Sequence, residues 1–169
     1  MFEKFIELSQ HVSFIMLVSA ILLGGVIGLA ARSRLSMVTA MIRYILLLAI
    51  GVTCLWEFVI QTFFASSFAG SMGVMQTPFQ FEVALANLGI ACAGIWAFKK
   101  GVDSWVTVAI MATCFNAGTA LAFVWNMLFG HVAHAGHMVY ADILTIFILD
   151  LLLLYYYQDQ KTRFFVASE

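Results

Sequence analysis

Residues 138–157 read MVYADILTIFILDLLLLYYY, and the length and composition of this stretch decide the fold class of the chain. About 20 residues of α-helix cross the hydrocarbon core of a bilayer, which is roughly 30 Å thick. Similar apolar stretches precede it at about 11–31, 41–65, 82–99 and 104–129. With 63% hydrophobic and only 10% charged residues, the chain lies outside the range of soluble globular domains. The sequence predicts an all-α polytopic membrane protein, a bundle of five transmembrane helices.

No linker, repeat or low-complexity tract divides residues 1–169, so we expect a single transmembrane domain. The first apolar stretch ends in GLAARS and therefore also has features of a signal peptide. Its leading segment MFEKFIELSQ carries two acids against one lysine, whereas signal peptides begin with positive charge. We interpret this stretch as a true first helix.

The basic residues predict the orientation of the bundle. With five crossings, the amino terminus, the 66–81 loop and the histidine-containing loop before the last helix share one side of the membrane. Lys4 lies on that side, and seven basic residues lie on the other: Arg32, Arg34, Arg43, Lys99, Lys100, Lys161 and Arg163. By the positive-inside rule we expect the amino terminus outside and the carboxyl terminus inside, in the plasma (inner) membrane of a prokaryotic cell.

The expected partners follow from the same composition. The lipid bilayer surrounds the chain, and eight basic residues against nine acids, without a basic run, give no nucleic-acid footprint. Small residues at four-residue spacing predict close contacts between helices. They form one row in the first helix and one in the third: Ala20, Gly24 and Gly28, then Gly89, Ala93 and Ala97.

Two carboxyl groups lie deep in the predicted spans. Glu57 lies eight residues before the outer end of the second helix, about 12 Å deep, and Asp150 lies near the midplane of the fifth. No lysine or arginine lies at their depth. Because an isolated charge in the membrane is costly, we expect each carboxyl to be protonated or to hold a cation.

Further polar residues lie in the outer half of four helices, beneath the histidine-containing loop. Each also has a structural interpretation: a carboxylate at a helix start is favoured by the helix dipole, asparagines form hydrogen bonds between helices, and a shallow aspartate reaches water. These further residues are Gln61, Glu82, Asn87, Asn126 and Asp142. Together with Glu57 and Asp150, they are the candidate ligand- or proton-binding residues.

The loop before the fifth helix, FGHVAHAGHMVYAD at 129–142, spaces three histidines evenly: His131, His134 and His137. Glycines on both sides favour a loop that wraps a metal. One or two of these histidines with Glu82 or Asp142 would form a nitrogen and oxygen set for zinc or another divalent ion. Three histidines in water, without a metal, are the simpler alternative.

The segments PFQFEVALANLGIACAGIWAF and MVYADILTIFILD resemble a family of small prokaryotic integral membrane proteins known only as a domain of unknown function. The resemblance covers roughly residues 45–157. It implies a helical membrane fold with Glu82, Asn87 and Asp142 as candidate site positions, and it brings no activity or cofactor. The family pattern has histidines and an aspartate where this chain has Gln61, Phe123 and Asn126, so polar groups of the family are replaced here.

Three functions are consistent with this sequence. The first is a protein that binds or transports a proton, a divalent metal or a small polar solute through the outer cluster. The second is an accessory or structural subunit of a larger membrane complex or homo-oligomer, in which Glu57 and Asp150 face a partner. The third is an intramembrane metal-dependent enzyme, which we place last because no motif such as HExxH occurs.

Overall fold

The computed structural model describes residues 11–30, 34–71, 77–129 and 137–167, and these residues form helices without a strand. Five helical stretches are long and apolar enough to cross a membrane: Val12–Ala30, Ser36–Phe63, Phe79–Ala97, Val102–Leu128 and Val139–Thr162. The prediction of an all-helical chain with five such helices is confirmed.

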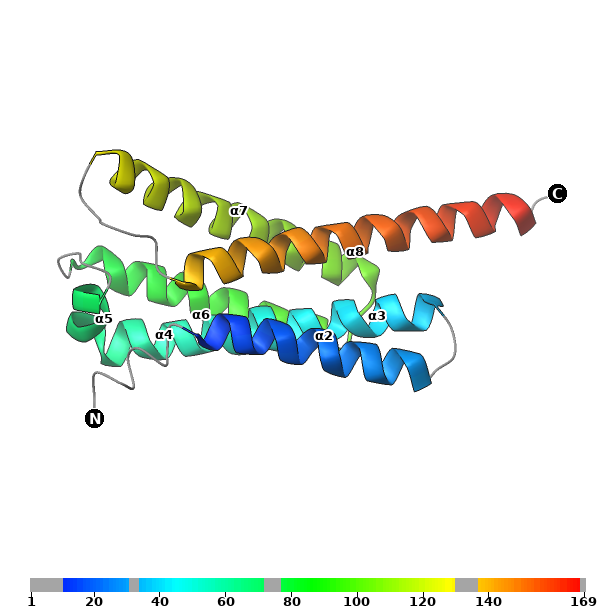
Figure 1. Cartoon of the computed structure of the whole chain (residues 1–169), viewed down its shortest axis with the longest axis horizontal. Coiled ribbons are helices and arrows are strands. Elements are labelled where there is room, and N and C mark those ends of the chain that lie inside the picture. The colour runs from blue at the N-terminus through cyan, green and yellow to red at the C-terminus, as the bar shows by residue number, and fades with distance from the viewer. Residues whose placement is uncertain (1–10, 31–33, 72–76, 130–136, 168–169) are drawn as a thin grey trace.

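The helices lie along one long axis, as Figure 1 shows. In chain order they are α2 (Val12–Ala30), α3 (Arg34–Tyr44), the π-helical η1 (Ile45–Val52), α4 (Thr53–Phe63), α5 (Ala65–Ser71), α6 (Phe79–Ala97), α7 (Val102–Leu128) and α8 (His137–Ala167). At one end of the bundle, on the left of Figure 1, α6 and α8 begin. We call it the Pro78 end, and we call the other, where a turn joins α6 to α7, the Lys100 end.

The second span is the centre of the bundle. It consists of α3, η1 and α4 in direct succession, and it contacts α2, α6, α7 and α8. Half of the residues in its most apolar window are buried (50%), against 17% in α7. Its buried side chains Ile42, Ile45, Leu46 and Ile50 form the middle of the hydrophobic core. A polar residue on the buried face of this span is therefore enclosed by several other helices.

Glycines allow α2 and α3 to approach closely. A Cβ on Gly24 would lie 2.7 Å from the Cα of Met41, and one on Gly28 would clash with the Cα of Met37. Both glycines and Ala20 are buried, so the row of small residues expected in the first helix does make a helix contact.

The corresponding expectation for α6 holds for part of the row, because Ala97 is buried and Ala93 packs against the core. Gly89 is exposed, and a Cβ there would meet nothing within 4 Å. Beside Ala97, the buried face contains Ala84, Asn87, Ala91 and Gly94. Small residues occur on several sides of this helix, so their spacing alone does not select the side that packs.

The helix boundaries differ most from the sequence prediction in four places. The second span begins at Ser36 rather than 41, α6 begins at Phe79 rather than 82, and α8 continues to Ala167 rather than 157. The short helix α5 occupies part of the predicted 66–81 loop. Polar residues extend these helices beyond their apolar segments. A prediction of helix ends from the apolar segment alone does not include these residues.

Large apolar side chains are exposed on the outside of the bundle, as in a membrane protein. They include Leu22, Val26, Leu121, Leu128, Phe147 and Leu154, which are 60–75% exposed. In a bilayer, these side chains contact lipid rather than water.

Candidate functional site

Glu57 points into the bundle from the middle of α4, and its side chain is only 9% exposed. Cys54 lies one turn before it and Gln61 one turn after it on the same buried face. The preceding π-helix ends where the Thr53 hydroxyl donates to the Leu48 carbonyl at 3.3 Å. Because a π turn contains more residues than an α turn, η1 sets the side of the helix on which Glu57 lies.

Asp142 reaches the same region from the second turn of α8. Its side chain is half-buried, and its carboxyl group lies within electrostatic range of the Glu57 carboxyl. The Cys54 thiol lies within range of both acids. The fold thus brings together two carboxyl groups from the second and fifth spans.

Two polar side chains from two further helices approach these acids. The Asn87 amide of α6 lies beside the Glu57 carboxyl, and the Ser13 hydroxyl of α2 lies beside the Asp142 carboxyl. Each is 1% exposed, yet neither forms a hydrogen bond of ordinary length and geometry. Buried polar atoms are normally paired, so this region has unused hydrogen-bonding capacity. We call Ser13, Glu57, Asn87 and Asp142 the carboxyl cluster.

No positive side chain of the described residues balances the charge of the carboxyl cluster. Arg43, Lys99 and Lys100 are exposed and belong to the Lys100 end. Two carboxylates in one buried site repel each other when both are ionised. The pair therefore needs a bound proton or another cation to lower its charge.

A pocket of about 340 Å³ lies at the Pro78 end, one helical turn beyond Glu57. Its lining residues are Gln61, Thr62, Ala65, Thr77, Pro78, Gln80 and Phe81. The Gln80 side-chain nitrogen donates to the Ala65 carbonyl at 3.2 Å and joins the starts of α5 and α6 beside it. The Gln61 side-chain oxygen is buried without a hydrogen bond. Gln61 thus lies between this pocket and Glu57.

Three of the candidate residues lie apart from the carboxyl cluster. Glu82 is exposed in the first turn of α6, as a carboxylate favoured by the helix dipole would be. The Asn126 side chain donates to the Ala122 carbonyl of its own helix at 2.8 Å. Asp150, two turns beyond Asp142 on α8, accepts a hydrogen bond from the Thr113 hydroxyl of α7 at 3.2 Å.

The predicted histidine metal site lies largely outside the described residues. His131 and His134 fall in 130–136, outside the described residues. His137 is the first residue of α8, and its side chain is not described. Among the residues that the structure describes, no group of three or more His, Cys, Asp and Glu side chains is placed to hold a metal ion.

Sequence reasoning missed Ser13 and Cys54 as members of this region. The available signal for Ser13 was a single hydroxyl at the start of a long apolar helix, and such hydroxyls are common in transmembrane helices. Cys54 lies one turn before Glu57, but a cysteine in an apolar stretch usually packs as a small apolar residue.

Comparison with known proteins gives one match. Residues 10–162 match the model of a family described as "Family of unknown function (DUF6790)". The match includes the first helix, which the resemblance seen in the sequence (45–157) did not. No curated protein and no solved structure matches the chain.

Proposed function

The chain belongs to the DUF6790 family of unknown function, and we propose a function for it from the geometry of the carboxyl cluster. The protein binds protons at Glu57 and Asp142 within the membrane and exchanges them with the solution at the Pro78 end. One observation carries this proposal: two carboxyl groups from different spans lie within electrostatic range of each other inside the bundle, and no basic side chain of the described residues balances them. Ionisable groups in such positions are typical of proton relays in membrane proteins.

The groups of the carboxyl cluster suit a proton better than a divalent metal. A protonated carboxyl is a hydrogen-bond donor, and an ionised carboxyl, an amide and a hydroxyl all supply acceptors. One proton on the pair therefore removes the repulsion and supplies a donor for one of the unpaired oxygens, that of Asn87 or that of Ser13. A divalent metal would require more protein ligands than the described residues bring together here.

A route for the proton begins at the 340 Å³ pocket. From there Gln61 leads to Glu57 one turn along α4, and the half-buried Asp142 lies within electrostatic range of Glu57. The Asp150–Thr113 hydrogen bond lies eight residues farther along α8, about 12 Å at 1.5 Å per residue. Water between Asp142 and Asp150 would continue the route toward the Lys100 end.

The proposed orientation places the Pro78 end outside a prokaryotic plasma membrane. Arg43, Lys99, Lys100 and Lys161 belong to the opposite half of the bundle, which the positive-inside rule assigns to the cytoplasm. Protons then enter the cluster from the outer solution.

The burial of Glu57 favours this function over an accessory subunit. A subunit that used Glu57 to bind a partner would present it on the outer surface of the bundle. Glu57 instead faces α6 and α8 of its own chain. Asp150 likewise has a partner, Thr113, within the chain.

Infrared difference spectroscopy on the purified protein in lipid tests proton binding directly. A pH titration should show the carbonyl stretch of a protonated carboxyl group, and Glu57→Gln should remove it. Glu82→Gln is the matched control, because it changes an exposed carboxylate at the same end. Persistence of the signal in Glu57→Gln and Asp142→Asn would reject the cluster as a proton site.

Transport requires a second experiment. Proteoliposomes that contain a pH-sensitive dye should acidify when an inside-negative potential is imposed, and Glu57→Gln should abolish this flux. Proton binding without flux would restrict the function to binding. A flux that falls when Na⁺ is added would instead assign the four oxygen-bearing side chains of the carboxyl cluster to a hard monovalent cation.

A further inference from the structure

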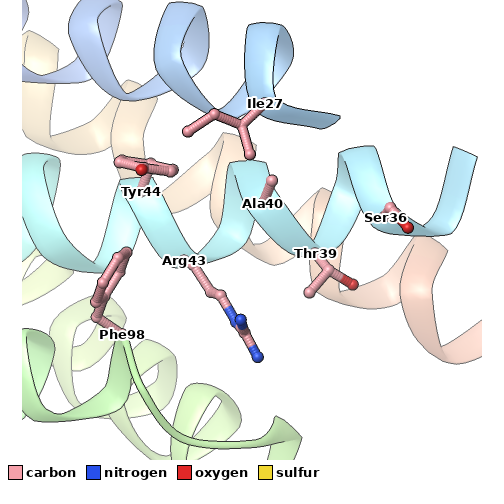
Figure 2. A pocket seen from close by; sticks show the side chains of 7 residues that line it. All are labelled: Ile27, Ser36, Thr39, Ala40, Arg43, Tyr44 and Phe98. Atoms are coloured by element: carbon pink, nitrogen blue, oxygen red, sulfur yellow. The ribbon is translucent and has the colours of Figure 1, made fainter. Parts of the chain in front are cut away.

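A second pocket, with polar and apolar walls, lies at the Lys100 end, remote from the carboxyl cluster. Its volume is about 440 Å³, and α2, α3 and the end of α6 form its walls, as Figure 2 shows. The polar lining residues Ser36, Thr39, Arg43 and Tyr44 all come from α3. Ile27, Ala40 and Phe98 supply the apolar part of the lining.

We infer that this pocket binds the phosphate headgroup of an anionic phospholipid, with Arg43 as the cation that recognises it. Arg43 is exposed, and the structure shows no carboxylate against it among the described residues. Its planar guanidinium can donate two hydrogen bonds to one phosphate. The hydroxyls of Ser36 and Thr39, two turns and one turn before Arg43 on the same helix, are further donors.

Aromatic contacts hold this site in shape before any ligand binds. The Arg43 guanidinium carbon lies 5.5 Å from the centre of the Trp105 ring, a cation–π distance. The Trp105 ring is itself fixed, because its indole nitrogen donates to the Ala97 carbonyl at 3.0 Å. On the other wall, Tyr44 and Phe98 meet edge to face with ring centres 5.5 Å apart. A rigid site loses less entropy when it binds a ligand.

The depth of the pocket favours a lipid over a dissolved anion. The second span, Ser36–Phe63, has 28 residues and is about 42 Å long, which exceeds the hydrocarbon core of roughly 30 Å. Its first turn therefore reaches the headgroup layer, and Arg43, seven residues or about 10 Å from the start, reaches the same layer with its long side chain. Exposed Lys99 and Lys100 follow Phe98 at the same end. Basic residues at this depth attract anionic lipids.

The size of the pocket agrees with the same ligand. At about 440 Å³ it falls within the range of small-molecule sites and is larger than one phosphate ion needs. Ile27 and Phe98 present apolar surface beside the hydroxyl groups, as Figure 2 shows. A glycerophosphate group with the start of its acyl chains matches this combination of polar and apolar walls.

Native mass spectrometry of the full chain tests the inference. The protein is purified in detergent, incubated with equal amounts of phosphatidylglycerol and phosphatidylcholine, and scored for retained lipid. Wild type should retain phosphatidylglycerol selectively, and Arg43→Gln should retain it roughly ten-fold less, as expected for the loss of charge-assisted hydrogen bonds. Arg43→Lys should restore part of the binding because it keeps the charge.

Lys100→Gln is the matched control, because Lys100 is also exposed and also lies over a tryptophan ring, with its ammonium 4.2 Å from the centre of Trp96. It does not line the pocket, so Lys100→Gln should lower phosphatidylglycerol binding much less than Arg43→Gln does. Thr39→Ala, which keeps all charges, should weaken phosphatidylglycerol binding by a smaller factor than Arg43→Gln does. A loss in this variant shows that the lipid binds in the pocket itself.

Three results would overturn the inference. Equal losses in Arg43→Gln and Lys100→Gln would indicate general attraction by a basic surface. Equal retention of the two lipids by wild type would remove the anion preference. Displacement of phosphatidylglycerol by millimolar inorganic phosphate would assign the pocket to a dissolved phosphate. A thermal unfolding midpoint for Arg43→Gln within a few degrees of wild type excludes misfolding as the cause of lost binding.

Discussion

The carboxyl groups of Glu57 on α4 and Asp142 on α8 lie within electrostatic range of each other inside the bundle. Asn87 and Ser13, from two other helices, approach one carboxyl each without a completed hydrogen bond. Four helices thus contribute to one polar site in a chain that otherwise buries almost entirely apolar side chains. This arrangement costs folding free energy, which is typical of functional sites in membranes.

The repulsion within this pair predicts non-additive effects on stability. Glu57→Gln and Asp142→Asn each remove the repulsion. The double variant should therefore gain less free energy of unfolding than the two single variants gain together. We expect a coupling energy of about 1 kcal/mol in the free energy of unfolding, measured in detergent with a denaturant. The coupling should grow as the pH rises, because the repulsion requires both carboxyls to be ionised.

The control for this cycle pairs Asp142→Asn with Glu82→Gln. Glu82 is exposed at the start of α6, so the two changes should add within experimental error. Additive behaviour of the Glu57 and Asp142 variants at every pH would mean that the two carboxyls do not act on each other in solution.

The close approach of α6 to η1 predicts a large effect at Gly94. A Cβ at this position would lie 2.7 Å from the Leu46 carbonyl oxygen and 3.1 Å from the Gly51 nitrogen, both backbone atoms. We expect Gly94→Ala to lower the free energy of unfolding by about 1–3 kcal/mol through overpacking. Gly89→Ala on the same helix, with nothing within 4 Å of its Cβ, should be neutral or slightly stabilising. Similar unfolding curves for the two variants would contradict this helix contact.

The hydrogen bond between Thr113 and Asp150 predicts a modest effect. Thr113→Val keeps the side-chain shape but removes the donor to the Asp150 carboxylate. Hydrogen bonds between transmembrane helices contribute about 0.6 kcal/mol on average, so we expect a loss of this size in the free energy of unfolding. Thr119→Val is the control, because Thr119 donates to Phe115 of its own helix. A larger loss for Thr119→Val would indicate that α7 and α8 are not held together by this bond.

The proposed orientation predicts which positions are accessible from outside the cell. In a variant without native cysteines, Thr77→Cys should react with a membrane-impermeant maleimide in intact cells. Lys100→Cys should react only after the membrane is made permeable, because both positions are exposed but belong to opposite ends of the bundle. The reverse pattern would invert the bundle and place the pocket beside Gln61 in the cytoplasm.

Much of the architecture was predictable because membrane helices are recognised by apolar length. The five spans follow from that signal, and errors occur mainly where polar residues extend a helix, as in the first turns of α3 and the last turns of α8. The π-helix Ile45–Val52 has no counterpart in the prediction. Its residues ILLLAIGV are apolar on all sides, so their pattern does not distinguish a π from an α helix.

The candidate site was only partly predictable. Depth along each helix placed Glu57, Asn87 and Asp142 at similar levels, and the structure brings these three residues together. The same reasoning included Glu82 and Asn126, which point elsewhere, because depth does not specify the side of the helix on which a residue lies. Ser13 was overlooked because a single hydroxyl at the start of an apolar helix is common in transmembrane helices.

The sequence by itself determined that this chain is helical and membrane-spanning, since apolar length and the cost of unpaired backbone groups in lipid leave a helix as the available structure. It also determined the depth of each polar residue, because a helix rises by a fixed 1.5 Å per residue. Only the tertiary structure decided which polar residues meet. The rotation of each helix depends on its close contacts, such as Gly94 against Leu46, and these contacts turn Glu57 toward Asp142.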